Sequence, residues 1–311
     1  MKKILVTGGA GYIGSKLVTK LLDLNFKVTV LDSLKYTSSS INHLFNNKNF
    51  YFYKGDVRDK KLLKKLVNKN EYIIPLAGLV GAPLCEKNKK EATAVNLNSI
   101  KYLTKIIKKK NKLIYLTTNS GYGVGSKTKY CDEQTSLNPI SLYGRTKVEA
   151  EKAVMKKNNV IAFRLATVFG YSYRMRTDLL VNNFVFKSIK DKKLTLYEPH
   201  FRRNYIHIND VVDAIVYSIS NFAHLKSNVY NLGLSSANLT KLMLVKKIKK
   251  KLKYLKVKII KNKKDPDQRD YFVSNKKIEK KGFKAKTSLE QGIDELIKVF
   301  NNSSEKVINN Y

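Results

Sequence analysis

The chain has 311 residues, and its 43% of hydrophobic residues excludes global disorder and fits about two domains of roughly 100–200 residues. Because no stretch approaches the roughly 18 apolar residues of a membrane-spanning helix, we expect a cytoplasmic protein with no membrane partner. The net charge of +37 would attract nucleic acid. However, only eight of the 61 basic residues are arginine, the residue on which nucleic-acid recognition most depends. We therefore attribute the many lysines to compositional drift and expect no nucleic-acid partner.

The first half of the chain alternates short apolar runs with amphipathic stretches. Apolar runs predict strands at residues 3–7, 27–31, 49–53, 72–76, 113–117 and 160–164. Apolar residues at helical spacing predict helices at residues 12–24, 60–68, 92–109 and 141–156. Strands separated by helices are typical of an α/β fold, a mostly parallel sheet with helices on both faces.

The alternation loosens after residue 167. We predict helices at residues 210–220, 239–254 and 289–301, and one strand at residues 229–232. Residues 246–264 form the densest run of charge, which we interpret as a solvated face. Since the chain has no internal repeat and no low-complexity linker, we expect its domains to interdigitate.

Four glycines fall within residues 7–14, between the first predicted strand and the first predicted helix. Gly8 would form the tight turn, Gly11 would let the backbone approach a pyrophosphate, and Gly14 would let the helix pack on the strand. The N-terminus of that helix offers N–H donors and a positive dipole end to phosphates. The pattern favours a nucleotide-binding loop over a plain turn.

Two aspartates follow the next two predicted strands. Asp32 can accept hydrogen bonds from the adenosine ribose and repel a 2′-phosphate, which favours NAD as the cofactor, although nearby Lys35 leaves some use of NADP open. Asp56 can hydrogen-bond an adenine amino group, with Val57 packed on the ring. Alternatively, Asp56 or Asp59 caps the helix that begins near residue 60.

Tyr143 and Lys147 are four residues apart and would lie on one face of a helix. A phenol has a reference pKa of about 10, and an adjacent ammonium together with the positive charge of a nicotinamide would favour the phenolate. Thr118 and Ser120 follow a strand at the carboxyl edge of the predicted sheet, where α/β proteins bind ligands. The pattern predicts an acid/base pair beside a hydroxyl that binds the reacting oxygen; the alternative is a surface tyrosine packed on a lysine stem beside an ordinary polar loop.

The sequence shows no sign of a disulfide framework or a metal site. Cys85 and Cys131 have no C-x-x-C spacing, and the four histidines have none of the spacings of metal ligands. We therefore expect reduced thiols and no catalytic metal.

Taken in order along the chain, these residues resemble the extended short-chain dehydrogenase/reductases of the NAD-dependent epimerase/dehydratase family, typified by UDP-glucose 4-epimerase. The likeness covers nearly the whole chain. Its motifs are residues 7–14, Asp32, residues 55–57 and 76–78, Asn96, Thr118, Tyr143, Lys147, and residues 203–210, 230–233, 265–277 and 282–283.

The resemblance implies a Rossmann-type NAD-binding domain formed by residues 1–167 and about 204–233. Residues 168–203 and 234–311 would form a smaller substrate-binding domain, with a nucleoside-diphosphate sugar in the cleft between the two. The implied NAD-binding residues are Gly8, Gly11, Tyr12, Ile13, Gly14, Asp32, Asp56, Val57, Leu76, Ala77, Asn96, Tyr143 and Lys147. The implied substrate-binding residues are Thr118, Ser120, Asn183, Arg203 and Arg269, with Arg174 and Arg176 in the same variable segment as Asn183. Helices 92–109 and 141–156 would form a homodimer.

The resemblance also implies that Tyr143 removes a hydroxyl proton while hydride passes to NAD, with Thr118 holding the oxygen and Lys147 tuning Tyr143. Dehydratases of the family carry Asp-Glu directly after the threonine, whereas this chain has Asn119 and Ser120 there. The glutamate of the decarboxylating members is also missing from this loop. We therefore predict an epimerase that acts by transient oxidation of a sugar hydroxyl carbon.

Other functions stay open. A reductase or oxidoreductase on a similar sugar needs the same residues, and a dehydratase would need other groups than Asn119 and Ser120. A non-catalytic Rossmann protein that binds nucleic acid is the remote alternative. Thr167 stands where the 4-epimerase has an asparagine near the substrate diphosphate, so UDP-glucose itself stays open as the substrate.

Overall fold

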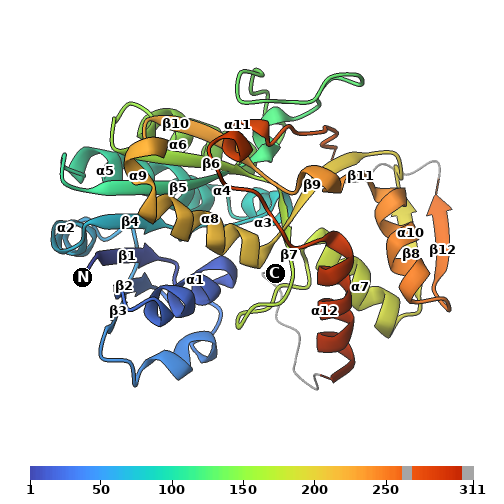
Figure 1. Cartoon of the computed structure of the whole chain (residues 1–311), viewed down its shortest axis with the longest axis horizontal. Coiled ribbons are helices and arrows are strands. Elements are labelled where there is room, and N and C mark those ends of the chain that lie inside the picture. Colours follow the sequence, from blue (N-terminus) through green and yellow to red (C-terminus); the bar gives the residue numbers. More distant parts are fainter. Residues whose placement is uncertain (261–267, 303–311) are drawn as a thin grey trace.

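The computed structural model describes residues 1–260 and 268–302, whose central feature is a seven-stranded parallel sheet of order β10-β6-β5-β4-β1-β2-β3 (Figure 1). This sheet confirms the predicted doubly wound α/β fold. Its strands are β1 (Lys3–Thr7), β2 (Lys27–Asp32), β3 (Phe50–Lys54), β4 (Tyr72–Pro75), β5 (Lys112–Thr118), β6 (Val160–Leu165) and β10 (Asn228–Leu232).

Helices cover both faces of this sheet because its buried strands are apolar on both sides. In β1, Ile4 and Val6 join the apolar cluster that holds α1 and α8, whereas Leu5 joins the cluster that holds α2, α5 and α6. The bounds of these helices are α1 (Tyr12–Asp23), α8 (Ile208–Ser220), α2 (Lys60–Lys69), α5 (Ser99–Ile106) and α6 (Leu142–Val154).

Two smaller sheets lie on the C-terminal side of the molecule, at the right of Figure 1. One has the order β11-β9-β7, and the other pairs β8 with β12 in parallel. Their bounds are β7 (Thr167–Phe169), β8 (Lys193–Tyr197), β9 (Arg202–His207), β11 (Asn238–Thr240) and β12 (Lys256–Ile260). Helices α7 (Leu180–Lys190), α10 (Lys241–Lys251) and α12 (Leu289–Asn302) lie beside them.

One continuous apolar cluster joins the two sides of the molecule. Buried residues of α7, α10 and α12 belong to the same cluster as those of α1 and α8. Strand β10, late in the chain, returns to pair with β6 at the edge of the main sheet. The division into two domains stays a prediction. None of the described helices combines the length and apolar character that a membrane crossing requires.

The remaining described elements are short. They are η1 (Ser39–Leu44), α3 (Ala82–Lys87), α4 (Lys89–Thr93), the π-helical turn η2 (Ala94–Asn98), η3 (Asn119–Tyr122), α9 (Phe222–Leu225), η4 (Ser235–Ala237) and α11 (Lys276–Lys280).

Two predicted helices differ from the observed elements. The helix predicted at 92–109 is interrupted by the π-helical turn η2 and ends at Ile106. The helix predicted at 239–254 begins as strand β11, where Leu239 pairs with Arg203 of β9. Thr240 then caps α10 by accepting a hydrogen bond from the backbone N–H of Met243 at 3.2 Å. Tertiary pairing overrides the apolar spacing here. Part of the predicted motif 265–277 lies outside the described residues.

Candidate active site

A cavity of about 850 Å³ lies at the carboxyl ends of β1, β4, β5 and β6. This is the edge where parallel α/β sheets place their ligands. Most predicted site residues line it: Gly8, Gly11, Tyr12, Ile13, Gly14, Leu76, Ala77, Asn96, Thr118, Ser120, Tyr143, Lys147, Asn183, Arg203 and Arg269. Asp32, Asp56 and Val57 are outside this lining, and their roles toward NAD stay predictions.

The backbone of the glycine loop between β1 and α1 is packed too closely for side chains at two of its positions. Gly8 has φ +74°, and a Cβ there would meet the backbone nitrogen of Ala77 at 2.5 Å. A Cβ on Gly14 would meet the carbonyl oxygen of Gly8 at 2.2 Å. No side chain caps the N-terminus of α1 at Gly11, so its first N–H groups are available to an anion. The loop therefore fits the pyrophosphate of a dinucleotide.

Asp32 is held in place at the end of β2. One carboxylate oxygen accepts the N–H of Ala10 at 2.9 Å, and the other accepts the N–H of Leu34 at 2.8 Å. Each carboxylate oxygen can accept a second hydrogen bond, which leaves capacity for a ribose hydroxyl. This fixed carboxylate is compatible with its predicted role beside the adenosine ribose.

The two aspartates that follow β3 have different partners. Asp59 caps α2 by accepting the N–H of Leu62 at 3.0 Å. Asp56 instead pairs with Arg58 at 2.6 Å, and this hydrogen-bonded guanidinium holds the pKa of Asp56 below its usual range. The cap alternative therefore applies to Asp59.

Asn96 fixes one wall of the cavity from the π-helical turn η2. Its side-chain oxygen accepts the N–H of Leu79, and its side-chain NH₂ donates to the carbonyl of Leu79, both at 2.9 Å. This amide clamp holds the loop after β4, which contains Leu76 and Ala77. A π-turn inside a helix is often found at functional sites, but no residue spacing in the sequence signals it.

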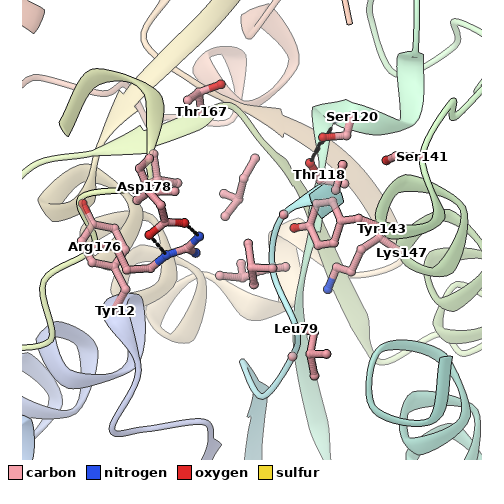
Figure 2. A pocket seen from close by; sticks show the side chains of 18 of the residues that line it. Tyr12, Leu79, Thr118, Ser120, Ser141, Tyr143, Lys147, Thr167, Arg176 and Asp178 are labelled. Atoms are coloured by element: carbon pink, nitrogen blue, oxygen red, sulfur yellow. Dashed lines mark hydrogen bonds and ion pairs between the residues drawn. The ribbon is translucent and has the colours of Figure 1, made fainter. Parts of the chain in front are cut away.

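Tyr143 and Lys147 lie together on α6 and face the cavity (Figure 2). Burial raises the pKa of Tyr143 to about 12, while the positive charges of Arg269 and Arg176 and a hydrogen bond with Thr118 oppose the rise. Burial lowers the pKa of Lys147 to about 7. The protein's own groups thus favour the neutral phenol, and the phenolate favoured by the Lys147 ammonium together with the nicotinamide charge stays a prediction.

Thr118 and Ser120 form a hydroxyl pair at the end of β5. The hydroxyl of Thr118 donates to that of Ser120 at 2.9 Å and accepts the N–H of Ser120 at 3.1 Å (Figure 2). The guanidinium of Arg269 also donates to the hydroxyl of Ser120. Arg203 donates to the carbonyl of Arg269, so the two predicted diphosphate contacts are held together. The structure therefore brings the hydroxyl pair and both arginines to one end of the cavity.

The wall opposite Tyr143 carries an ion pair that the sequence reasoning did not single out. Arg176 and Asp178 are both buried and form a two-pronged pair (Figure 2). Their spacing of two residues on a loop matches no motif, so no periodicity could have revealed the pair. Tyr12 lies near them, but its hydroxyl donates to the carbonyl of Gly170 at 2.7 Å. Its predicted contact with NAD would therefore come from its backbone.

A second buried ion pair joins α6 to strand β6 of the main sheet. The carboxylate of Glu151, one turn after Lys147, accepts hydrogen bonds from Arg164 of β6 at 2.7 and 3.1 Å. Arg164 also donates to the hydroxyl of Tyr122 at 3.1 Å. The helix that carries Tyr143 is thereby fixed to the sheet.

Comparisons with known proteins point to one family. Residues 4–233 match the sequence model of the NAD dependent epimerase/dehydratase family. A dTDP-D-glucose 4,6-dehydratase of Dictyostelium discoideum is 32% identical over 258 residues; the match covers 75% of this chain, and the chain spans 58% of that protein's length. A putative UDP-glucose 4-epimerase of Methanocaldococcus jannaschii is 25% identical over 313 residues, which covers 97% of this chain and 99% of that protein. The structure of the UDP-glucose 4-epimerase of Thermus thermophilus, solved with NAD, has the same fold, with a TM-score of 0.81 at 22% identity over 97% of this chain and 99% of that one.

Proposed function

The chain belongs to the NAD-dependent epimerase/dehydratase family, and on that premise we propose that it is an epimerase of nucleoside-diphosphate sugars. Bound NAD would supply the acceptor, and then the donor, of the hydride that a sugar carbon exchanges during inversion. The glycine loop, Asp32 and the backbone near Leu76 and Ala77 would hold NAD in the cavity. Arg203 and Arg269 would bind the substrate diphosphate with forked, permanently charged donors.

Side chains of α6 and of the end of β5 would transfer the proton and bind the oxygen in this reaction. Tyr143 would take the proton of the sugar hydroxyl as the carbon loses hydride, and would return it when hydride comes back. Thr118 would hold the reacting oxygen by a hydrogen bond. Because burial raises the pKa of Tyr143 to about 12, the phenolate needs the positive charge of Lys147 and of the bound nicotinamide.

The observation that carries the proposal is the absence of a free carboxylic acid on the described cavity wall. Its described carboxylates are Asp178 and Asp270, paired with Arg176 and Arg202 respectively. Asn119 and Ser120, where the dehydratases carry an acid pair, have side chains that do not ionise near neutral pH and so cannot act as a carboxylic acid and a carboxylate. Loss of water requires an acid for the departing hydroxyl and a base for the carbon-bound proton, whereas epimerisation requires neither.

A dehydratase is the second candidate. The Dictyostelium dehydratase shares a higher percentage of identical residues with this chain, 32%, than the Methanocaldococcus protein does, 25%. Among the described residues of the cavity wall, a dehydratase would have only Asp178 and Asp270 to recruit, each out of its ion pair. A sugar reductase would use the same Tyr143, with net consumption of reduced cofactor.

We also propose a homodimer formed by α5 and α6, a cytoplasmic location and no nucleic-acid partner. The exposed side chains of these two helices are Lys101, Lys105, Arg145, Glu149 and Lys152. This face is predominantly basic, so salt should strengthen the dimer. Light scattering tests the homodimer. A mass of one 35.6 kDa chain at every salt concentration would contradict the homodimer.

Replacement of Tyr143 by phenylalanine tests the catalytic assignment. We expect Tyr143→Phe to lower kcat at least about 100-fold, because the proton-transfer group is lost. Tyr130→Phe is the matched control, since Tyr130 is 55% exposed and outside the cavity lining. Equal turnover by the wild type and Tyr143→Phe would contradict the assignment.

A further inference from the structure

The segment between β7 and α7 is fixed against the first turn of α1. The hydroxyl of Tyr12 donates to the carbonyl of Gly170 at 2.7 Å, and the hydroxyl of Ser172 donates to the carbonyl of Tyr12 at 2.6 Å. The hydroxyls of Ser15 and Ser172 are also 3.1 Å apart. Three contacts therefore hold this segment beside the helix whose N-terminus follows the glycine loop.

Arg174 extends this segment into the cavity. Its side chain lines the cavity wall although the residue is only 3% exposed. Its Nε and Nη2 are buried and have no hydrogen-bond partner among the described residues. Its guanidinium carbon lies 4.5 Å from the centre of the Tyr36 ring. Arg176, two residues later, differs because Asp178 neutralises it.

A buried guanidinium without a hydrogen-bonding partner is costly, since burial removes its water. Burial and the positive charge of Arg176 both lower the pKa of Arg174. An arginine stays charged in proteins, so the vacant donors are matched to an anion rather than to a neutral group.

The neighbours of Arg174 indicate that it lies on the proposed NAD side of the cavity and not on the proposed substrate side. Tyr36 lies on the loop after β2, four residues beyond Asp32, and the carboxylate of Asp32 interacts electrostatically with Arg174. In a doubly wound fold this loop and the glycine loop hold the adenosine and pyrophosphate of a dinucleotide. Arg203 and Arg269, the proposed contacts of the substrate diphosphate, are instead next to Ser120.

We propose that Arg174 is a cofactor-binding residue that binds the pyrophosphate of NAD through its guanidinium fork. The inference rests on the NAD site of the proposed function. Arg174 would add a charged donor from the C-terminal side of the cavity to the backbone N–H donors of the glycine loop. The loop that carries Arg174 would thereby couple cofactor binding to the segment leading to Asn183, which lines the same cavity.

Calorimetric titration of the whole chain with NAD tests this assignment. We expect Arg174→Met to weaken NAD binding about 10- to 100-fold, the range for a hydrogen bond to a charged group. Arg174→Lys keeps the charge without the fork and should show a smaller loss. Lys64→Met removes one charge from an exposed position of α2 outside the cavity lining and should bind NAD like the wild type.

Titration with UDP and NADP identifies the anion. We expect UDP binding to be unchanged in Arg174→Met. Weaker UDP binding with unchanged NAD binding would overturn it in favour of the substrate diphosphate. A loss confined to NADP would overturn it in favour of a 2′-phosphate. Unchanged NAD binding in both Arg174 variants would also overturn it, whereas a wild type that binds no NAD would instead refute the NAD site of the proposed function.

Thermal melting without ligand supplies a readout that is independent of binding. Because Arg174→Met removes a buried charge without a hydrogen-bonding partner, its melting temperature should equal or exceed that of the wild type. A lower melting temperature together with unchanged NAD binding would overturn the proposal by showing that Arg174 stabilises the fold instead.

Discussion

Lys147 and Tyr143 lie one helical turn apart on α6, and burial moves their pKa values in opposite directions. The pKa of Lys147 falls to about 7, while that of Tyr143 rises to about 12. Both shifts favour the uncharged form, as burial does for any titratable group. The site therefore holds Tyr143 as a neutral phenol, whose pKa additional positive charge would lower.

The shift of Lys147 predicts a pH dependence of stability. In the folded chain Lys147 loses its proton near pH 7, but in the unfolded chain it keeps the proton until about pH 10.4. The unfolded state therefore binds more protons between these values, and the contribution of Lys147 to stability rises with pH. The free energy of unfolding of the wild type, minus that of Lys147→Met, should increase from about pH 7 to about pH 9.5 in urea titrations.

Lys152→Met is the matched control for this measurement. Lys152 lies on the same helix, and its side chain is 64% exposed and paired with Glu149. The difference between wild type and Lys152→Met should stay flat over the same pH range. A flat difference for Lys147→Met as well would refute the lowered pKa.

The motifs at the residue scale were predictable because their chemistry depends on sequence spacing. Gly8, Gly14, Tyr143 and Lys147 all line the cavity. The role of Arg174 was not predictable, because it depends on whether Arg174 or Arg176 pairs with the nearby carboxylate of Asp178. Arg174 and Arg176 have the same residue type and nearly the same position, and only the folded chain shows that Asp178 pairs with one of them.

Helix α6 is the element that positions the acid/base pair. Ser141 caps it by accepting the N–H of Gly144 at 3.1 Å, and its far end is fixed by the ion pair of Glu151 with Arg164. Both side chains of this ion pair are buried, with 6% and 8% of their surface exposed. Loss of one partner would leave an uncompensated charge in the interior.

We expect Glu151→Ala to lower the free energy of unfolding by about 3–5 kcal/mol, the range for one broken partner of a buried pair. Glu149→Ala removes an exposed carboxylate of the same helix, paired with Lys152, and should cost about 0–1 kcal/mol. Urea unfolding of both variants at neutral pH measures the two costs. Equal costs would show that the buried pair does not anchor α6.

Prediction of the elements succeeded where structure is local. The strands and helices of the first half follow one another in space, so apolar spacing within each segment revealed them. Strands β8 (Lys193–Tyr197) and β12 (Lys256–Ile260) pair across more than 50 intervening residues, and each is only five residues long. Pairing over such a distance leaves little pattern in the local sequence. The two small sheets were therefore not predicted.

The charge of the whole molecule affects its ligands more than its fold. A net charge of +37 raises the local concentration of anions such as nucleotide sugars and speeds their encounter at low salt. The parallel sheet and its two helical faces depend instead on apolar side chains, which the composition supplies. This is why the α/β class was predictable despite an unusual surface.

Mass spectrometry with chromatographic separation of the reaction products tests the proposed epimerase activity most directly. The protein would be incubated with NAD and a panel of UDP-, GDP-, CDP- and dTDP-sugars, with Tyr143→Phe as the inactive control. We expect, for at least one donor, a product of unchanged mass and new retention time. A product that has lost water, or a two-hydrogen change matched by cofactor consumption, would contradict the epimerase assignment and identify a dehydratase or a reductase instead.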